Sequence, residues 1–384
     1  VQNVKFAQKK AIECISKGAE SIYFVIPKSS ITLSELLKDI DVSKISIYLE
    51  LQFLDSSFID QINALNFSVD THVYIISDCI GHLTKSGNWY ENMATDKKQT
   101  QHYCASASGV KSVLAVDMAH YQNAGAGMVQ QLAYGLAHAN EYLNHFNSKI
   151  SRPLTFNLAV GSNYFFEIAK LRALRLLLGV LAREYNLNDT CYIFAQPSKR
   201  NKTIFDYNNN MLRTTTESMS AILGGANTVC NLAYDSVYHN PNEFGNRISR
   251  NQLLVLKHES YFSAVSNPSD GAYYIEDITN QLAEKSLDLF KKIETNGGFL
   301  KQLKEGTIQR KIKEQAGKEQ LNFNTGEEIL LGSNKHPNLE DKMKDQLELY
   351  PFVKTNQRKT LLEPIIEKRL VEQLEQERLK KEQQ

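Results

Sequence analysis

Short runs of β-branched and aromatic residues alternate along this chain with longer stretches in which apolar residues recur three or four positions apart. The first pattern is typical of buried parallel strands, and the second is typical of helices with one apolar face. Because strands and helices alternate, the strands should pair in parallel, and seven of them in series favour a (β/α)8 barrel over an open sheet. The predicted strands are residues 21–26, 45–51, 72–76, 112–118, 154–160, 191–196 and 228–234. The predicted helices are residues 3–17, 33–38, 57–64, 127–145, 164–185, 210–223 and 248–265, with Thr32 and Glu35 as a capping box before the second.

The pattern changes after residue 279. Residues 280–320 are charged and helical, with Gly297-Gly298 as a break between two helices. Residues 322–360 are polar and irregular, and a last helix is expected from Leu362, with Ile366, Leu370 and Leu374 on one face. We therefore expect a barrel over residues 1–279, a helical segment over 280–321 and a polar extension over 322–384. The extension has too little apolar content to fold alone and is expected to wrap over a neighbour.

Composition narrows the class of protein. A chain of 384 residues with 42% hydrophobic residues can bury a large core. Its 44 basic and 43 acidic residues leave a net charge of +1, which excludes a global attraction to nucleic acid or to an anionic membrane. The longest apolar stretch, residues 174–182, is far shorter than the roughly 20 residues that cross a bilayer. The five cysteines are scattered, which predicts free thiols and a cytoplasmic protein.

Several short motifs follow one another at tight spacings between residues 206 and 272. They are Asn210-Met211-Leu212-Arg213-Thr214, Gly224-Gly225, Glu243-Phe244-Gly245, Arg250-Asn251 and Asn267-Pro268. Further motifs lie upstream, namely Ala124-Gly125-Ala126, Gln131-Leu132-Ala133-Tyr134, Glu141-Tyr142-Leu143 and residues 167–173. In their order and spacing these motifs resemble methylmalonyl-CoA mutases, and the resemblance covers about residues 112–279. In that family the first barrel strand precedes the helix that opens this chain, so it is expected upstream of Val1, which is not a Met start.

The resemblance implies chemistry that needs adenosylcobalamin. Family members interconvert methylmalonyl-CoA and succinyl-CoA by a radical rearrangement, with the acyl-CoA threaded along the barrel axis to the cofactor. Catalytic subunits hold cobalamin in a C-terminal domain that carries D-x-H-x-x-G. Here Asp70-Thr71-His72 begins correctly, but Ile75 occupies the place of the glycine and the segment reads as a strand. We therefore expect no cofactor in this chain and adenosylcobalamin in a partner subunit.

Carried over position by position, the substrate residues of the family are partly kept. His120 stands where catalytic subunits keep a His beside the thioester carbonyl, but Ala119 replaces the neighbouring Tyr. Pro153 stands where a CoA-binding Arg is expected, and a slip of one residue would bring in Arg152. Thr155 stands where a Ser is expected. His120 is the residual catalytic candidate, although a His at a strand end is more often a satisfied polar group.

Two further pocket candidates follow from the same comparison. Gln196 matches a retained pocket Gln, whereas Phe194 replaces the His two residues earlier, and Asn227 stands where the family uses a Gln. The substrate-pocket candidates are thus Thr155, Gln196 and Asn227, and any of them could instead bridge loops over a closed barrel. No catalytic or cofactor-binding residue is assigned with certainty.

One group of residues lies outside the resemblance. Asp78, Cys79, His82, His102 and Cys104 bracket a polar loop, and two Cys with two His form a weak zinc candidate set. Their spacing is not that of a standard zinc site, so the ordinary loop interpretation is favoured.

The leading hypothesis is the small subunit of a heterodimeric, adenosylcobalamin-dependent methylmalonyl-CoA mutase, which stabilises or regulates a homologous cobalamin-binding large subunit. The alternative is a fragment of an active acyl-CoA mutase whose cobalamin domain lies beyond Gln384; His120, Gln196 and Asp235 favour it. A third hypothesis is an acyl-CoA-binding barrel without a catalytic partner. An acyl-CoA is a potential ligand under all three, whereas nucleic acid and membranes are not expected partners.

Overall fold

The computed structural model describes residues 1–68, 70–146, 150–354 and 357–382. The chain divides into two compact units, each described by itself. Unit 1 comprises Val1–Asp117, His138–Phe156 and Leu178–Tyr192. Unit 2 comprises Met118–Ala137, Asn157–Leu177 and Ile193–Gln384. Residues 383–384, at the end of the predicted extension, lie outside the described residues.

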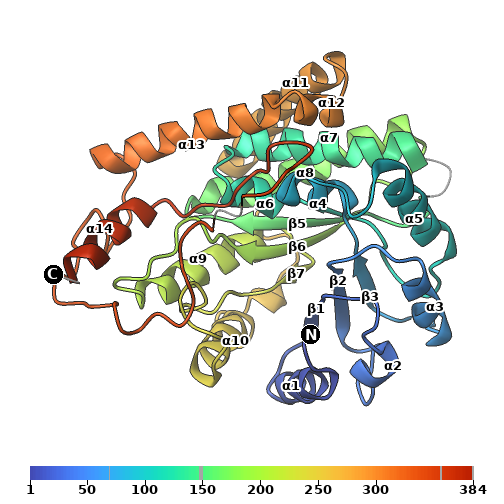
Figure 1. Cartoon of the computed structure of the whole chain (residues 1–384), viewed down its shortest axis with the longest axis horizontal. Coiled ribbons are helices and arrows are strands. Elements are labelled where there is room, and N and C mark those ends of the chain that lie inside the picture. The colour runs from blue at the N-terminus through green and yellow to red at the C-terminus, as the bar shows by residue number, and fades with distance from the viewer. Residues whose placement is uncertain (69, 147–149, 355–356, 383–384) are drawn as a thin grey trace. The chain divides into compact units, whose positions relative to one another are not determined.

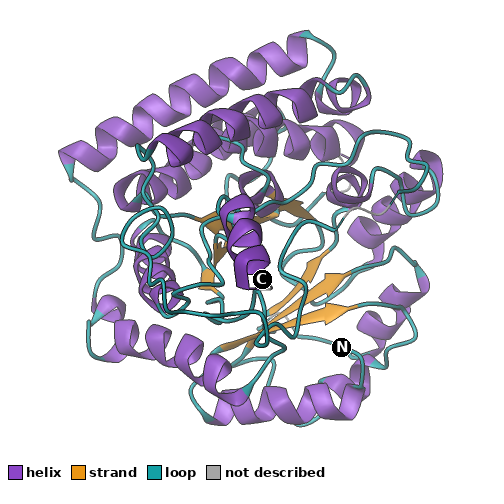
Figure 2. Ribbon diagram, turned by 60° about the vertical axis from the view of Figure 1, so that its left-hand side comes forward, coloured by secondary structure: helices purple, strands orange, loops and turns teal. Residues whose placement is uncertain are grey.

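The strands follow one another in chain order. One sheet contains β1 (Ser21–Ile26), β2 (Ser46–Leu51) and β3 (Val73–Ile76), which pair in parallel and appear in Figures 1 and 2 as three arrows side by side near the N-terminus. A second sheet has the order β4 (Ala115–Asp117), β5 (Thr155–Val160), β6 (Tyr192–Pro197) and β7 (Thr228–Val229). A parallel bridge joins Tyr74 of β3 to Ser112, just before β4. The predicted α/β class with parallel strands is confirmed.

Unit 1 has more helices than its sequence predicted. Its helices are α1 (Val4–Ser16), α2 (Leu33–Leu36), α3 (Ser57–Ala64), α4 (Cys79–Ser86) and α5 (Met93–Ser106). The last two occupy the segment predicted to be a polar loop. Asp78 accepts the Gly81 amide at the start of α4, and Asn92 accepts the Thr95 amide at the start of α5, so each helix has a side-chain cap. The capping box predicted at Thr32 is wrong, because the Thr32 side chain makes no capping hydrogen bond.

Unit 2 holds most of the C-terminal helices. They are α6 (Met118–Asn123), α9 (Asn209–Leu223), α10 (Glu243–His258), α11 (Tyr273–Thr295), α12 (Phe299–Lys304), α13 (Thr307–Thr325) and α14 (Glu372–Glu382), with a 3-10 turn at Phe262–Ala264. Helices α7 (Met128–Phe146) and α8 (Tyr164–Glu184) begin in unit 2 and end in unit 1. The break predicted at Gly297-Gly298 separates α11 from α12, and both glycines have positive φ angles.

Helix α10 and the last helix do not begin where they were predicted. Helix α10 begins five residues before the predicted start at residue 248, since the Asn242 side chain accepts the Gly245 amide and fixes the first turn. The last helix begins at Glu372, not at Leu362. No helix among the described residues is both long enough and apolar enough to cross a membrane. All five cysteines are free, as predicted.

Candidate functional site

His120 is the candidate that lies where barrel enzymes place their catalytic side chains. It belongs to the short helix α6, which directly follows β4, and active sites of barrel enzymes are built at the carboxyl ends of strands. The ring is 3% exposed. Its Nδ1 lies 3.4 Å from Oε1 of Glu367, and the other carboxylate oxygen of Glu367, Oε2, lies 3.5 Å from Nζ of Lys199. The partner that faces this nitrogen is therefore a carboxylate of the chain's own C-terminal segment.

Aromatic side chains fill the face of the sheet in unit 1. Tyr23, Tyr48 and Tyr74 are in register on β1, β2 and β3, so their side chains lie on the same face. The rings of Tyr48 and Tyr74 stack with centroids 4.5 Å apart. Tyr74 also meets Tyr192, the first residue of β6, edge to face at 4.8 Å. Since β3 and β6 belong to different sheets, this contact brings together rings from both sheets within unit 1.

Gln196 and Phe194 belong to the same row of side chains as Tyr192. Side chains alternate along a strand, so residues 192, 194 and 196 of β6 point to one face. Phe194 is 1% exposed, and Gln196 near the end of the strand is half-buried. The sequence comparison expected a His in place of Phe194. The strand thus presents two aromatic rings and one amide on the face where a polar pocket was expected.

Thr155 and Asn227 lie at the beginnings of their strands. Thr155 is the first residue of β5 and is fully buried, and its hydroxyl has no hydrogen-bond partner among the described residues. Asn227 immediately precedes β7, and its side-chain oxygen accepts the Ile193 amide at 2.8 Å and Nη2 of Arg175 at 2.9 Å. Asp235 accepts the side-chain amide of Asn242 at 2.6 Å. Asn227 and Asp235 therefore connect neighbouring segments of the fold.

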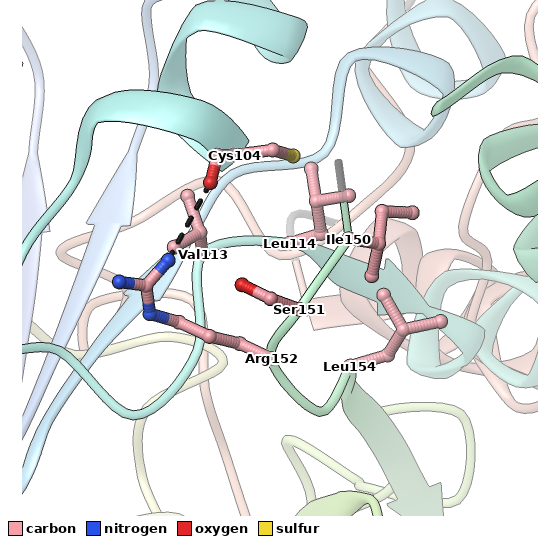
Figure 3. Close-up of a pocket in the computed structure, with 7 residues that line it drawn as sticks. All are labelled: Cys104, Val113, Leu114, Ile150, Ser151, Arg152 and Leu154. Atoms are coloured by element: carbon pink, nitrogen blue, oxygen red, sulfur yellow. Dashed lines mark hydrogen bonds between the residues drawn. The ribbon is translucent and has the colours of Figure 1, made fainter. Parts of the chain in front are cut away.

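Arg152 donates hydrogen bonds to three backbone carbonyls. Its guanidinium donates to the carbonyl oxygens of Val110 at 3.1 Å and Ala107 at 2.6 Å. It also donates to the Cys104 carbonyl at 3.4 Å, the bond drawn in Figure 3. These carbonyls lie at and beyond the end of α5, where helix carbonyls lack partners within the helix. The adjoining cavity measures about 10 Å³, which holds at most one water. Pro153 has no guanidinium, and the guanidinium of Arg152 is bound to carbonyls of the protein itself. Neither residue is therefore placed to bind a CoA phosphate.

The weak zinc set does not assemble. Cys79 is buried beside the hydroxyl of Thr100 at 3.5 Å, and burial raises the pKa of its thiol to about 12. Burial likewise raises the pKa of Cys104 to about 12. His82 stacks on Tyr90, and His102 is paired with Ser106. Across the described ranges, no three His, Cys, Asp or Glu side chains gather closely enough to hold a metal ion.

Asp78 instead belongs to a buried cluster that the sequence did not reveal. Its Oδ1 accepts Nε2 of His138 at 2.9 Å and the hydroxyl of Tyr142 at 2.6 Å, and its Oδ2 accepts the Asp117 amide at 2.9 Å. Burial alone would raise the pKa of Asp78, but the charge and hydrogen bond of His138 and the Tyr142 hydroxyl outweigh it, holding the pKa at about 2. His138 and Tyr142 lie four residues apart on α7, and this spacing was the sequence feature that could have indicated the cluster.

Two buried lysine–glutamate pairs were also missed as pairs. Lys170 and Glu167, 0% and 1% exposed, form an ion pair at 2.6 Å. Lys170 also donates to the side chains of Gln122 at 2.7 Å and Gln131 at 3.0 Å. The i,i+3 spacing of Glu167 and Lys170 on α8 was the signal. Burial lowers the pKa of Lys170, and the nearby charge of Glu167 opposes this shift.

The second pair joins Lys202, in the loop after β6, to Glu217 on α9 at 2.8 Å. Both side chains are 1% exposed. Burial lowers the pKa of Lys202 and raises the pKa of Glu217. Each buried charge is therefore matched by its partner, and the second pair ties α9 to the loop that follows β6.

The segment that partly matches the cobalamin motif has no room for a cofactor. His72 immediately precedes β3, and its carbonyl accepts the Ile47 amide at 2.7 Å in the strand pairing. Ile75, at the place of the motif's glycine, is 0% exposed inside β3. A motif loop that holds cobalamin must project from a strand end, so these residues do not fit the group.

Comparison with known proteins gives one family. The sequence model of the family described as methylmalonyl-CoA mutase matches residues 32–382. The methylmalonyl-CoA mutase small subunit of Porphyromonas gingivalis is 33% identical over 376 residues, covering 90% of this chain and 59% of that relative. The methylmalonyl-CoA mutase of Rhizobium meliloti is 36% identical over 227 residues, covering 56% of this chain and 32% of the relative. The large subunit of Porphyromonas gingivalis is 31% identical over 227 residues, with the same two shares. The chain thus spans about three fifths of the small subunit's length and about a third of the other two.

Proposed function

Because the chain belongs to the methylmalonyl-CoA mutase family, we propose that it is the small subunit of a heterodimeric, adenosylcobalamin-dependent methylmalonyl-CoA mutase. In this proposal the homologous large subunit binds cobalamin and interconverts methylmalonyl-CoA and succinyl-CoA. This chain stabilises or regulates that subunit and performs no chemistry itself. Residues 1–279 form a (β/α)8 barrel, residues 280–321 a helical segment and residues 322–384 the extension.

The aromatic face of the sheet carries the proposal. Tyr74 contacts both Tyr48 and Tyr192, so three rings from three strands pack together in unit 1. An acyl-CoA that ran along the axis of a barrel would have to displace these rings. Separating packed aromatic side chains costs on the order of several kcal/mol, because each ring loses buried area and a specific ring contact. A barrel with this interior is suited to packing and not to holding a threaded substrate.

The pocket candidates support the same proposal. His120 faces Glu367, the side chain of Asn227 is occupied by Ile193 and Arg175, and Thr155 begins its strand. His120 and Asn227 thus contact groups of the protein itself. We propose that His120, Thr155, Gln196 and Asn227 are remnants of an ancestral acyl-CoA pocket, now part of the packing.

The share of the chain that each relative covers supports the small-subunit assignment. The match to the relative named small subunit spans 90% of this chain, whereas the match to the relative named large subunit spans 56%. Under this proposal the two chains pair in the cytoplasm, in keeping with the free cysteines.

One retained feature favours the alternative, an active acyl-CoA mutase. His120 is still buried directly after β4, where a proton donor or oxyanion partner would be needed. The two proposed functions predict different effects on kcat when this imidazole is removed.

The test is co-expression of this chain, carrying an affinity tag, with the large subunit of the same organism. We expect a one-to-one complex whose mutase activity requires the large subunit, and no activity from this chain with added adenosylcobalamin. The change His120→Asn in this chain should leave kcat of the complex within about twofold, because His120 touches no substrate. Failure to form a complex, or a loss of kcat of about 100-fold in His120→Asn, would reject the proposal and favour the alternative.

A further inference from the structure

A segment of the C-terminal extension lies against the loops that follow β4 and β6. We call residues 361–371 the strap; it is the red chain that leads into α14 in Figure 1. It contains no helix or strand, yet Leu362, Ile365 and Leu370 are each 5% exposed or less. An irregular segment that buries its apolar side chains must be held in place by specific contacts.

Backbone hydrogen bonds join the strap to both loops. The Lys368 amide donates to the carbonyl of Asn123, the last residue of α6, at 3.1 Å. The Leu370 amide donates to the carbonyl of Arg200 at 2.8 Å, and Nη1 of Arg200 donates back to the Lys368 carbonyl at 2.7 Å. The strap therefore bridges the segment after β4 and the segment after β6.

Arg369 fixes the strap from within. Its guanidinium is 5% exposed and donates to the carbonyls of Lys202 at 2.9 Å and Pro351 at 3.1 Å. It also pairs with Glu375 at 2.6 Å, and Glu375 accepts the Ile204 amide at 2.8 Å. A buried arginine with this many partners keeps its geometry only while all of them stay in place.

A small apolar cluster holds the end of the strap. Leu370 and Val371 pack with Phe323 and Leu330, all buried. On the opposite side, Arg200 pairs with Glu319 of α13 at 2.6 Å. The strap is thus held by backbone, ionic and apolar contacts at once.

The side chain that the strap brings to the strand ends is Glu367. Its carboxylate approaches both the buried ring of His120 and the ammonium of Lys199. Ligands of barrel proteins enter at the carboxyl ends of the strands. Glu367 lies at that place as a carboxylate supplied by the chain itself.

We propose that the strap is a built-in occupant that closes the strand ends around His120 to an acyl-CoA, with Arg369 as its latch and Glu367 as the group facing His120. This proposal rests on the proposed function only in naming acyl-CoA as the ligand that is kept out. The closure itself concerns this chain alone and needs neither partner nor cobalamin.

Hydrogen exchange of the purified chain measures the closure. We expect the amides of Lys368 and Leu370 to exchange at least about 100-fold more slowly than in an unstructured peptide, because both are hydrogen-bonded to loop carbonyls. Exchange at the rate of an unstructured peptide would overturn the proposal.

The latch is tested by Arg369→Ala, with Lys313→Ala as the control. Lys313 pairs with Glu363 of the same strap, but both side chains are more than half exposed. Arg369→Ala should speed exchange of the two strap amides about tenfold and leave the Ile193 amide of β6 unchanged, whereas Lys313→Ala should change neither. If Arg369→Ala does not fold, Arg369→Lys provides the test. Exchange of the strap amides should then accelerate about threefold, because an ammonium cannot reproduce the several directed hydrogen bonds of the planar guanidinium. Unchanged exchange in the folded variant would overturn the latch.

The cover over His120 is tested with diethylpyrocarbonate, read out by mass spectrometry of the peptide that contains His120. In Arg369→Ala, or Arg369→Lys, the carbethoxylation of His120 should accelerate together with strap exchange, by about tenfold or threefold respectively. Faster strap exchange without faster modification of His120 would show that the strap does not cover the ring. Failure to pair with a large subunit would reject the proposed function and leave these results unaffected.

Discussion

At the scale of single residues, two polar side chains that the sequence comparison singled out hydrogen-bond to groups of the protein itself. Asn227 illustrates this: its side-chain oxygen accepts from a strand amide and an arginine. Such a bond is worth about 1 kcal/mol to the fold, and the same oxygen is then unavailable to a ligand. Arg152 is a further example, since three backbone carbonyls accept hydrogen bonds from its guanidinium.

Arg152→Ala should therefore reduce stability and have no effect on ligand binding. The three carbonyls would lose a charged donor, and we expect the free energy of unfolding to fall by about 3 kcal/mol. Urea titration followed by circular dichroism measures this. The control is Arg310→Ala, which removes an exposed i,i+4 pair with Glu314 and should cost no more than about 0.5 kcal/mol. Equal losses in the two variants would contradict the role given to Arg152.

Asp78 should make stability depend on pH in acid. Its pKa lies at about 2, below the ordinary value of 3.8, so its contribution is complete above about pH 4 and is lost as the pH falls toward 2. This titrating part amounts to about 2 kcal/mol. The difference in free energy of unfolding between the protein and Asp78→Asn should be largest at neutral pH and shrink between pH 4 and pH 2. A difference that stays constant over this range would exclude the predicted cluster.

At the scale of elements, a break of defined geometry separates α11 from α12. Gly298 has φ 87° and ψ 174°, a region that only glycine occupies without strain. Gly317 lies inside α13, where an added Cβ would meet nothing within 4 Å. Gly298→Ala should destabilise by about 1–3 kcal/mol, whereas Gly317→Ala should stabilise by about 0.5–1 kcal/mol. Thermal unfolding should move in opposite directions in the two variants, and a shift of the same sign would contradict this account.

Elements with a clear apolar stripe could be predicted from the sequence. Helix α3 agrees with its predicted bounds because Phe58, Ile59 and Ile62 recur at helical spacing and are all buried. Helix α5 could not be recognised in that way, since two of its four buried residues, Asp96 and Thr100, are polar. The side chain of Asn92 caps the start of α5, but this role cannot be recognised until the helix itself is identified.

The last helix was misplaced for a physical reason. Ile366, Leu370 and Leu374 recur four residues apart, which indicated a helix, but Ile366 is 51% exposed, Leu370 is buried, and of the three only Leu374 lies in α14. Pro364 disfavours a helical conformation at the preceding residue, and the Lys368 and Leu370 amides bond to loops far away in the sequence. Tertiary contacts therefore decide the conformation of the strap, and local periodicity could not reveal them.

The site shows the same limit. Motif spacing indicated which positions to compare, including His120 and Phe194, and the structure shows that both are buried. The partners could not be inferred, because Glu367 lies 247 residues after His120 and Tyr192 meets Tyr74 from a strand that is not its neighbour. Spacing within a sequence carries no information about such distant contacts.

At the scale of the whole molecule, the chain keeps the sequence pattern of the family together with a series of parallel strands. The match to the family spans residues 32–382, and the strands follow one another in chain order within two sheets. The rings of Tyr48, Tyr74 and Tyr192 pack together in unit 1, and in unit 2 the strap contacts the segments that follow β4 and β6. These observations support the proposed role as a subunit that stabilises or regulates a partner.

The most direct test of this claim is the cobalamin content of the purified complex between this chain and its large subunit, from the visible absorption of the bound corrinoid. We predict one cobalamin for each pair of chains, all of it on the large subunit after the chains are separated. Two cobalamins for each pair, or corrinoid bands on this chain alone, would contradict the account.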